Sequence, residues 1–192
     1  LLKYDTVYRH WAHDISTSGQ NIIIDGKNVK VLAEKDPSAL PWKDLGVDVV
    51  VESTGLFTSY DKAEAHIKAG AKKVVISAPS KGDTGGVAGE TILLGVNEDK
   101  FGTCDVTSNA SCTTNAASPL IAILDEALGI EKAVLNTVHG YTASQALVDG
   151  PSKKDAREGR AAAQNIVPSS TGAAIAVTKA FPELTGLFDG IS

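Results

Sequence analysis

The sequence is poor in several residue types that define particular classes of protein. It has no methionine and only two cysteines, Cys104 and Cys112, among 192 residues. Two cysteines without framework spacing exclude a disulfide-stabilised scaffold and favour free thiols in a reducing compartment. The four histidines show no metal-ligand spacing with the cysteines, so we expect no metal site. No apolar run reaches the roughly 18 residues of a membrane-spanning helix, so we expect no membrane partner.

Blocks of basic residues are also missing. The chain has 18 lysines and arginines against 23 aspartates and glutamates, for a net charge of -5. Without a cluster of positive charge, nucleic acid and anionic membranes are excluded as main partners. The hydrophobic content of 43% is ordinary for a soluble globular protein, and the length allows one domain or two small ones. Because the chain starts without an initiator methionine and ends in apolar residues, we expect an internal piece of a longer protein.

Residues 47–80 predict a βαβ unit. The apolar run over 47–55 is typical of a strand that is buried on both faces in a parallel sheet. A helix over 61–69, ended by Gly70, leads to a second apolar strand over 72–80. The two strand ends should meet at the carboxyl edge of the sheet, where open α/β sheets bind ligands. These ends are Ser53-Thr54-Gly55 and Ser77-Ala78-Pro79.

The remaining elements follow from turn residues and periodicity. In chain order they are a hairpin over 21–32 that turns at Asp25-Gly26, a flexible Gly-rich connection over 81–91, a strand over 91–97, a helix over 113–128 that contains Pro119, a strand over 132–141 and a helix over 168–181. The Gly-rich connection lacks the Gly-Lys-Ser/Thr ending of a P-loop. Residues 142–160 are polar and long for a structureless connection, which indicates a functional or interface loop. His66 is expected to be an exposed helical residue.

Cys112 lies among small hydroxyl residues immediately before the 113–128 helix. A thiolate is the reactive form of cysteine, and a helix N-terminus lowers the pKa of a thiol through its free N–H groups and positive dipole end. The same donors can stabilise a negative oxygen. The alternative is a structural cysteine packed as a small hydrophobe, and residue chemistry alone leaves both interpretations open. Cys104, near a strand start, is expected to be structural.

His139, at the end of the 132–141 strand, is the candidate base for such a thiol. Histidine titrates near neutral pH and commonly activates a nucleophile, although an ordinary satisfied histidine is the alternative. A helix that opens after small hydroxyl residues favours phosphate, although ordinary N-caps would look the same. The residues that suit an anion in this way are Ser111, Thr113, Thr142, Thr171 and Gly172.

Together these motifs resemble the glyceraldehyde-3-phosphate dehydrogenase family. The stretch SNASCTTN, residues 108–115, is similar to the active-site signature of that family. Other segments resemble the family in the same order, namely VVESTGLF, VVISAPS, TVHGYT, DGPSKKD and NIVPSSTGAA. The resemblance implies an α/β fold with a partial Rossmann-type NAD-binding domain, residues 1–111, that lacks its first βα unit. The start of an α+β catalytic domain, residues 112–192, would follow.

The resemblance also implies an activity. The family oxidises glyceraldehyde 3-phosphate with NAD and inorganic phosphate to 1,3-bisphosphoglycerate in glycolysis, as a cytoplasmic homotetramer. Cys112 would form a thiohemiacetal and then a thioester, and His139 would activate it. The implied phosphate and substrate residues are Ser111, Thr113, Thr142, Thr171 and Gly172, and the implied NAD residues are Lys35, Thr54, Gly55, Phe57, Ser77 and Ala78. Residues 142–160, with Gly150-Pro151, resemble the NAD-preferring form of a loop at the tetramer core.

The sequence departs from the family pattern at three places. Ala116 replaces a frequent second cysteine, which removes an oxidation partner for Cys112. Lys35 replaces an arginine on the adenine side, and lysine lacks the forked, stacking guanidinium. The segment 80–97 is longer than usual.

Three alternative functions stay open: erythrose-4-phosphate dehydrogenase, a non-catalytic binding module, and a cysteine hydrolase, which would not explain the cofactor-like strand ends.

Overall fold

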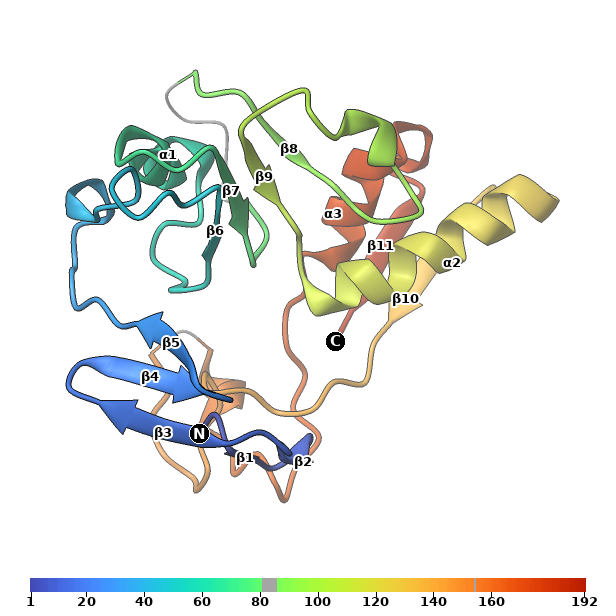
Figure 1. The fold of residues 1–192 in the computed structure, drawn as a ribbon. Helices are drawn as coiled ribbons and strands as arrows, with labels where there is room; N and C mark the ends of the chain where they lie inside the picture. The colour runs from blue at the N-terminus through green and yellow to red at the C-terminus, as the bar shows by residue number, and fades with distance from the viewer. Residues whose placement is uncertain (81–85, 154) are drawn as a thin grey trace.

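The computed structural model describes residues 1–80, 86–153 and 155–192 as a mixed α/β structure (Figure 1). Its strands are β1 (Tyr4–Asp5), β2 (Arg9–His10), β3 (Ile15–Ser18), β4 (Asn21–Ile24), β5 (Lys27–Lys30), β6 (Val49–Glu52), β7 (Lys73–Ile76), β8 (Gly89–Thr91), β9 (Val106–Ser108), β10 (Ala133–Asn136) and β11 (Phe188–Ile191). Its α-helices are α1 (Tyr60–Lys68), α2 (Cys112–Leu128) and α3 (Ala173–Ala180), and its 3-10 turns are η1 (Pro37–Ala39), η2 (Glu98–Lys100), η3 (Ala156–Gly159) and η4 (Pro182–Leu184). No described helix is long and apolar enough to cross a membrane.

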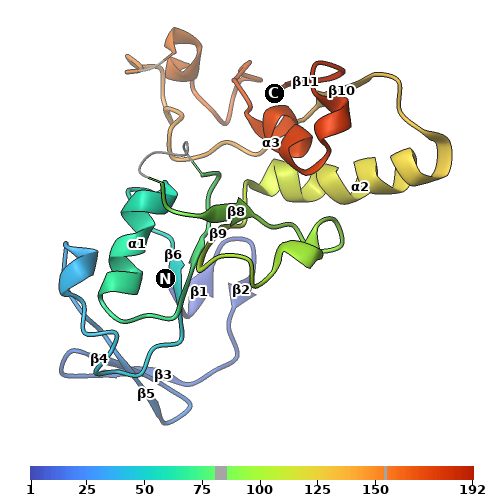
Figure 2. The same cartoon turned by 90° about the horizontal axis from the view of Figure 1, so that it is seen from above.

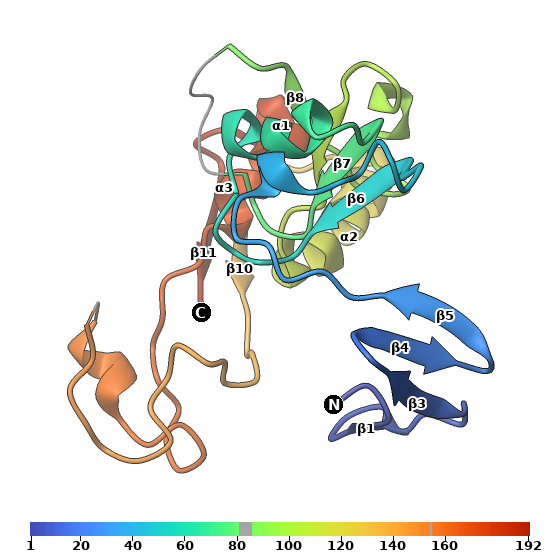
Figure 3. The same cartoon turned by 60° about the vertical axis from the view of Figure 1, so that its left-hand side comes forward.

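The predicted hairpin is confirmed as β4 and β5. The two strands pair antiparallel, with β3 on the other side of β4. Asp25 and Gly26 have φ values of 48° and 76°, the left-handed pair that a two-residue hairpin turn requires. This three-stranded sheet extends away from the rest of the molecule (Figure 3).

The βαβ prediction is also confirmed. β6 and β7 pair parallel with α1 between them, and the sheet order is β6-β7-β9-β8 with every pair parallel. Residues from α1 and the strands share one core, formed around Ala63, Val74, Ile76 and Val106. The sheet therefore has the alternating architecture of a nucleotide-binding domain.

The prediction that the first strand is buried on both faces was wrong. Val50 and Glu52 face the core, whereas Val49 and Val51 are 53% and 62% exposed. β6 is an edge strand of this sheet, and in the described part of the chain its second face stays open to solvent. The apolar run therefore predicts the strand correctly, but it does not predict that one face of the strand is exposed.

The predicted strand over 91–97 ends at Thr91. Val96 N–H donates to the Leu93 carbonyl at 3.1 Å, and the Asn97 side chain accepts from Leu93 N–H at 2.8 Å. These bonds form a turn over residues 93–97, where the apolar pattern had predicted a continuous strand. Of the predicted Gly-rich connection, residues 81–85 lie outside the described residues, and Gly89–Thr91 form β8.

A second core lies between α2, α3 and the parallel pair β10 and β11. Its buried residues are Ala117, Ile121, Ala174, Val177, Leu184 and Phe188. α2 and α3 pack side by side, as Figure 2 shows. The two cores suit the predicted division at residue 112, which stays a prediction.

Gly70, which ends α1, is expected to be intolerant of a side chain. Its φ is +106°, and an added Cβ would lie 2.5 Å from the Lys43 Cβ and 2.7 Å from the Lys43 backbone nitrogen. We expect Gly70→Ala to lower the free energy of unfolding by about 2–4 kcal/mol, from backbone strain and overpacking together. Urea unfolding of the complete gene product measures this loss.

Gly46 provides the matched control. Its φ is +63°, and nothing lies within 4 Å of an added Cβ, so Gly46→Ala adds only the left-handed backbone cost of about 1–2 kcal/mol. Equal losses at the two glycines would contradict the steric role of Lys43.

Candidate active site

Three strand ends meet at one edge of the central sheet. β6, β7 and β9 are parallel, so their carboxyl ends lie on the same side. Ser77 donates from its N–H and its Oγ to the Glu52 carbonyl, at 3.0 and 3.1 Å. Asn109 N–H donates to the Ile76 carbonyl at 2.9 Å. The turns after β6 and β7 and the segment from β9 to Cys112 thus share one edge.

Cys112 is the first residue of α2. Ser111 is the N-cap, and its Oγ accepts from Thr114 N–H at 3.0 Å. Ala110 has a φ of 55°, and this left-handed residue turns the chain between β9 and the helix. The Cys112 side chain is exposed, whereas Cys104 is buried with its thiol directed at the Val106 carbonyl. The structure thus separates a surface thiol at a helix start from a buried structural one.

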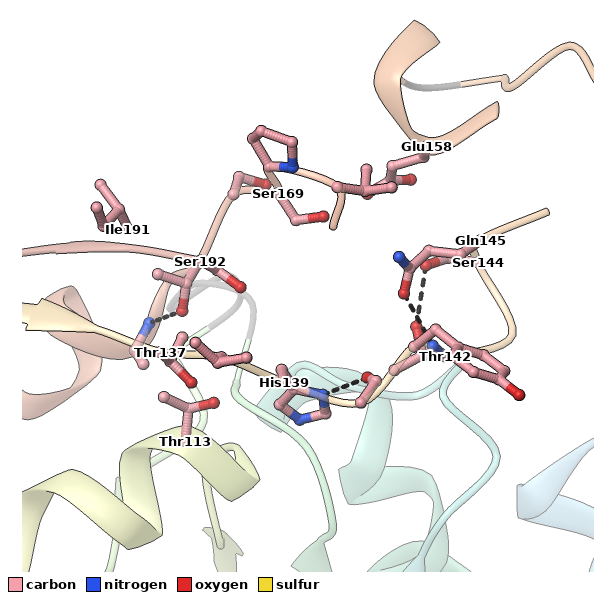
Figure 4. Close-up of a pocket in the computed structure, with 18 of the residues that line it drawn as sticks. Thr113, Thr137, His139, Thr142, Ser144, Gln145, Glu158, Ser169, Ile191 and Ser192 are labelled. Carbon is pink, nitrogen blue, oxygen red and sulfur yellow. Dashed lines mark hydrogen bonds between the residues drawn. The ribbon is translucent and has the colours of Figure 1, made fainter. Parts of the chain in front are cut away.

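His139 lies next to the Cys112 thiol. Its Nε2 is 3.2 Å from the Cys112 Sγ. Its Nδ1 is 2.6 Å from the Gly140 carbonyl oxygen, a contact that Figure 4 marks with a dashed line. A carbonyl oxygen only accepts, so Nδ1 carries the ring proton of the neutral imidazole. Nε2 is therefore free to accept the thiol proton. The predicted strand over 132–141 is shorter in the structure: β10 ends at Asn136, and His139 follows it in a loop instead of ending the strand.

The pKa shifts of the two groups reinforce one another. The hydrogen bond with His139 is the main cause that lowers the pKa of the Cys112 thiol, and the backbone N–H of Thr113 lowers it further. The Gly140 carbonyl, followed by the Cys112 contact, raises the pKa of His139. The lowered pKa of Cys112 and the raised pKa of His139 both favour the thiolate–imidazolium form of the pair.

A cavity of about 840 Å³ adjoins the pair and is lined by all five of the predicted anion residues. The predicted residues that line it are Ser111, Thr113, His139, Thr142, Thr171 and Gly172. The N-termini of α2 and α3 both open onto this cavity, because Ser111 caps α2 and Gly172 caps α3. Two helix N-termini supply free N–H groups and positive dipole ends, which suit a phosphate or carboxylate.

Several of the predicted hydroxyl groups already have partners in the chain. Thr171 Oγ1 accepts from Ala173 N–H at 3.1 Å, and Thr142 Oγ1 lies 3.1 Å from Ser144 Oγ in a local turn (Figure 4). Ser111 Oγ also lies 2.7 Å from Thr114 Oγ1. These hydroxyls cap and close the elements that frame the cavity, as the N-cap alternative predicted, while the residues still line it.

The predicted cofactor residues fall into two groups. Thr54, Gly55, Ser77 and Ala78 lie at the sheet edge, and the neighbouring Pro79 lines the cavity. Phe57 follows the β6 turn, with its ring 6.5 Å from that of His66. Lys35 lies on the exposed segment between β5 and η1, and its N–H donates to Glu34. Within the described residues, no hydrogen bond or ion pair connects Lys35 with the sheet edge.

Glu52 and His66 were missed by sequence reasoning. His66 was expected to be exposed, but it is only 5% exposed, and Glu52 is 3% exposed. They hydrogen-bond to each other at 2.9 Å. The available signal was Glu52 itself, because it alternates with Val50 on the core side of β6, where an unpaired carboxylate would be very costly.

The fold and site together define a class of protein. A Rossmann-like parallel sheet whose carboxyl edge leads to a thiol–imidazole pair indicates a nucleotide-binding α/β protein with an activated cysteine. Comparison with family models is more specific. The NAD binding domain of glyceraldehyde 3-phosphate dehydrogenase matches residues 1–60, and the C-terminal domain matches residues 111–192. The chain therefore belongs to the glyceraldehyde-3-phosphate dehydrogenase family, and its predicted fold class is confirmed.

Individual relatives agree with the family models. Glyceraldehyde-3-phosphate dehydrogenase B of Aspergillus oryzae is 51% identical over 192 residues, which are 100% of this chain and 56% of the relative. Glyceraldehyde-3-phosphate dehydrogenase 1 of Trichoderma koningii is 50% identical over 100% of this chain and 55% of its own length. The enzyme of Podospora anserina is 51% identical, with 100% and 56% covered. The chain thus spans a little over half the length of these relatives.

Proposed function

We propose that the protein oxidises glyceraldehyde 3-phosphate with NAD and converts it, with inorganic phosphate, to 1,3-bisphosphoglycerate. The observation that carries this proposal is the 3.2 Å contact between Cys112 Sγ and His139 Nε2 at the start of α2. Such a pair provides a thiolate nucleophile and an adjacent proton carrier. The site lies on the sheet edge where a nucleotide cofactor is expected in this fold.

The sheet edge fits NAD. Gly55 has a φ of +75° with nothing within 4 Å of an added Cβ, so a ligand can approach the backbone closely. The same edge reaches the cavity through Pro79. We propose that Thr54, Gly55, Phe57, Ser77 and Ala78 hold NAD, which when bound accepts a hydride from the substrate. We further propose that Lys35 contacts the adenine end of NAD.

The first chemical step uses the pair directly. His139 Nε2 takes the proton of the Cys112 thiol, and the sulfur attacks the aldehyde carbon to form a carbon–sulfur bond. The carbonyl oxygen becomes an oxyanion, which the N–H groups at the α2 start stabilise. Proton transfer from the imidazolium gives the thiohemiacetal. His139 would then remove the hydroxyl proton as the same carbon gives its hydride to the nicotinamide ring of NAD, and a thioester on Cys112 would remain.

The second step returns the thiol. A phosphate oxygen attacks the thioester carbon, the carbon–sulfur bond breaks, and the leaving thiolate is stabilised by the neighbouring imidazolium. We propose that the α2 and α3 N-termini hold the attacking phosphate and the substrate phosphate. The residues concerned are Ser111, Thr113, Thr142, Thr171 and Gly172, which all line the cavity. Backbone N–H groups suit this role better than the hydroxyls that already act as caps.

We also propose a homotetramer in the cytoplasm, where the protein serves glycolysis. The loop over 142–160 leaves the body of the molecule after β10 (Figure 3). Residues 149–150 and 159–160 of this loop are held together by two contacts. Gly150 N–H donates to the Gly159 carbonyl at 2.9 Å, and Arg160 forms an ion pair with Asp149 at 2.8 Å. A preformed projecting loop suits a subunit contact. The two free cysteines suit a reducing compartment.

The proposed substrate is tested by kcat/KM with two aldehydes. We expect NADH formation by the complete gene product to require phosphate for repeated turnover, and kcat/KM to favour glyceraldehyde 3-phosphate over erythrose 4-phosphate by at least about tenfold. A preference for the longer aldehyde would assign the protein to the alternative activity. NAD binding without oxidation of either aldehyde would support a binding module instead.

A further inference from the structure

A directional hydrogen-bond chain is buried beneath the sheet edge. Trp42 Nε1–H donates to His66 Nδ1 at 3.0 Å, and an indole N–H can only donate. His66 Nδ1 therefore carries no proton, so the neutral ring has its proton on Nε2 and donates to Glu52 Oε2 at 2.9 Å. Trp42 thus fixes the tautomer of His66, and His66 fixes the Glu52 carboxylate as an acceptor.

Glu52 holds both turns of the proposed NAD site. Its Oε1 accepts from Thr54 N–H at 2.8 Å and also from the Thr54 hydroxyl. Its backbone carbonyl accepts from the N–H and the Oγ of Ser77, at 3.0 and 3.1 Å. Leu56 N–H donates to Thr54 Oγ1 at 3.1 Å, so the hydrogen-bond network of Glu52 also includes the residue after Gly55.

The Glu52 carboxyl group stays ionised in spite of its burial. Burial raises its pKa, but hydrogen bonds from Thr54 and His66 outweigh this effect and hold the pKa below its usual value. The Glu52 carboxylate accepts from Thr54 N–H, the Thr54 hydroxyl and His66. Because loss of any of these donors would leave buried negative charge uncompensated, the carboxylate is held in one orientation. Neither Glu52 nor His66 has a part in the chemistry proposed for Cys112.

We propose that Glu52, oriented by His66 and Trp42, is the positioning residue that shapes the Thr54–Gly55 and Ser77–Ala78 turns for NAD. This inference rests on the proposed NAD-dependent function. It also revises the part of Thr54, because its hydroxyl proton is already donated to Glu52 and its oxygen already accepts from Leu56 N–H. Thr54 and Gly55 then offer NAD their backbone, and the fit of the cofactor depends on the buried carboxylate behind them.

Glu52→Gln in the complete gene product tests this inference. The new amide must direct its NH₂ group either at the His66 Nε2–H or at the Thr54 donors, so one pair of donors always faces each other. His66 cannot relieve the conflict by changing its tautomer, because Trp42 already donates to Nδ1. We expect the Kd of NAD, measured by equilibrium titration, to rise about tenfold or more, while the rate of Cys112 alkylation by iodoacetamide stays unchanged.

The double variant Glu52→Gln/Trp42→Phe separates this mechanism from a general loss of packing. Phenylalanine removes the indole donor, so His66 can move its proton to Nδ1 and accept from the amide through Nε2. We expect the double variant to recover most of the lost NAD affinity. A packing defect would instead make the two substitutions additive, and this result would overturn the inference. Glu64→Gln, at a half-buried position of α1 whose carboxylate pairs with Lys68, is the matched control and should leave the Kd unchanged.

The outcomes also distinguish this inference from the proposed function. Failure of the unsubstituted protein to bind NAD overturns the proposed function. Normal NAD binding by Glu52→Gln overturns only the positioning role. If Glu52→Gln does not fold, Thr54→Val serves in its place, since it keeps the side-chain shape and removes the hydroxyl donor to Glu52, while the backbone donor of residue 54 remains. We expect about a tenfold weaker NAD affinity from it with unchanged alkylation of Cys112, and unaltered affinity would equally overturn the inference.

Discussion

Cys112→Ser is expected to reduce NAD-dependent oxidation of glyceraldehyde 3-phosphate at least about 10³-fold. A serine hydroxyl has a far higher pKa than a thiol, so the 3.2 Å contact with His139 would no longer yield an anion near neutral pH. An ester is also a poorer acyl donor to phosphate than a thioester. Initial rates of NADH formation by the complete gene product, with and without phosphate, measure the loss.

The second cysteine is the natural control for this experiment. Cys104 is buried, and its thiol lies 3.2 Å from the Val106 carbonyl, to which a serine hydroxyl can also donate. Cys104→Ser should therefore keep nearly full activity. Full phosphorylating activity of Cys112→Ser would contradict the covalent mechanism, because no thioester could then form.

His139→Asn is expected to lower kcat about 10²–10⁴-fold, the usual contribution of a positioned acid or base. It should also change the pH dependence of Cys112 alkylation. The hydrogen bond from His139 is the main cause of the lowered pKa of Cys112, so its loss moves the thiol pKa upward, toward the ordinary value of about 8.5. The thiolate, present in the native protein at lower pH, would then form only at more alkaline pH.

The rate of iodoacetamide labelling against pH gives the midpoint in each variant. His10→Asn, at an exposed position in β2 far from the thiol in the sequence, should leave the midpoint where it is. An unchanged midpoint in His139→Asn would mean that the helix start alone acidifies Cys112, and His139 would then lose its proposed role as the first proton acceptor.

Local features of the fold could be predicted from the sequence because their causes are local. Asp25-Gly26 supplies the two left-handed residues of a hairpin turn, and Gly70 ends α1 with a φ that other residues avoid. The helix after Ser111 follows from its cap and its apolar stripe, and α2 starts within one residue of the prediction. Each of these signals acts within a few residues of the structure that it specifies.

Features that depend on contacts between distant segments could not be predicted in the same way. Trp42 and His66 are 24 positions apart, and Glu52 and His66 are 14 apart, so no local pattern reports that their polar atoms meet in the core. The open face of β6 is likewise a property of its surroundings. Cys112 and His139 could be paired through their chemistry and the family resemblance, but their contact, and the direction of the ring, come only from the structure.

The orientation of the His139 ring depends on the main chain and not on another side chain. The Nδ1 proton of His139 is held by the carbonyl of Gly140, a main-chain group, at 2.6 Å. A side-chain carboxylate in this place would be a third position at which a single substitution could destroy the pair. A peptide carbonyl is present whichever amino acid occupies position 140. A substitution there would therefore affect the His139 ring only if it changed the path of the backbone. Of the three groups in this arrangement, only the Cys112 thiol and the His139 imidazole can therefore be removed by replacing a side chain.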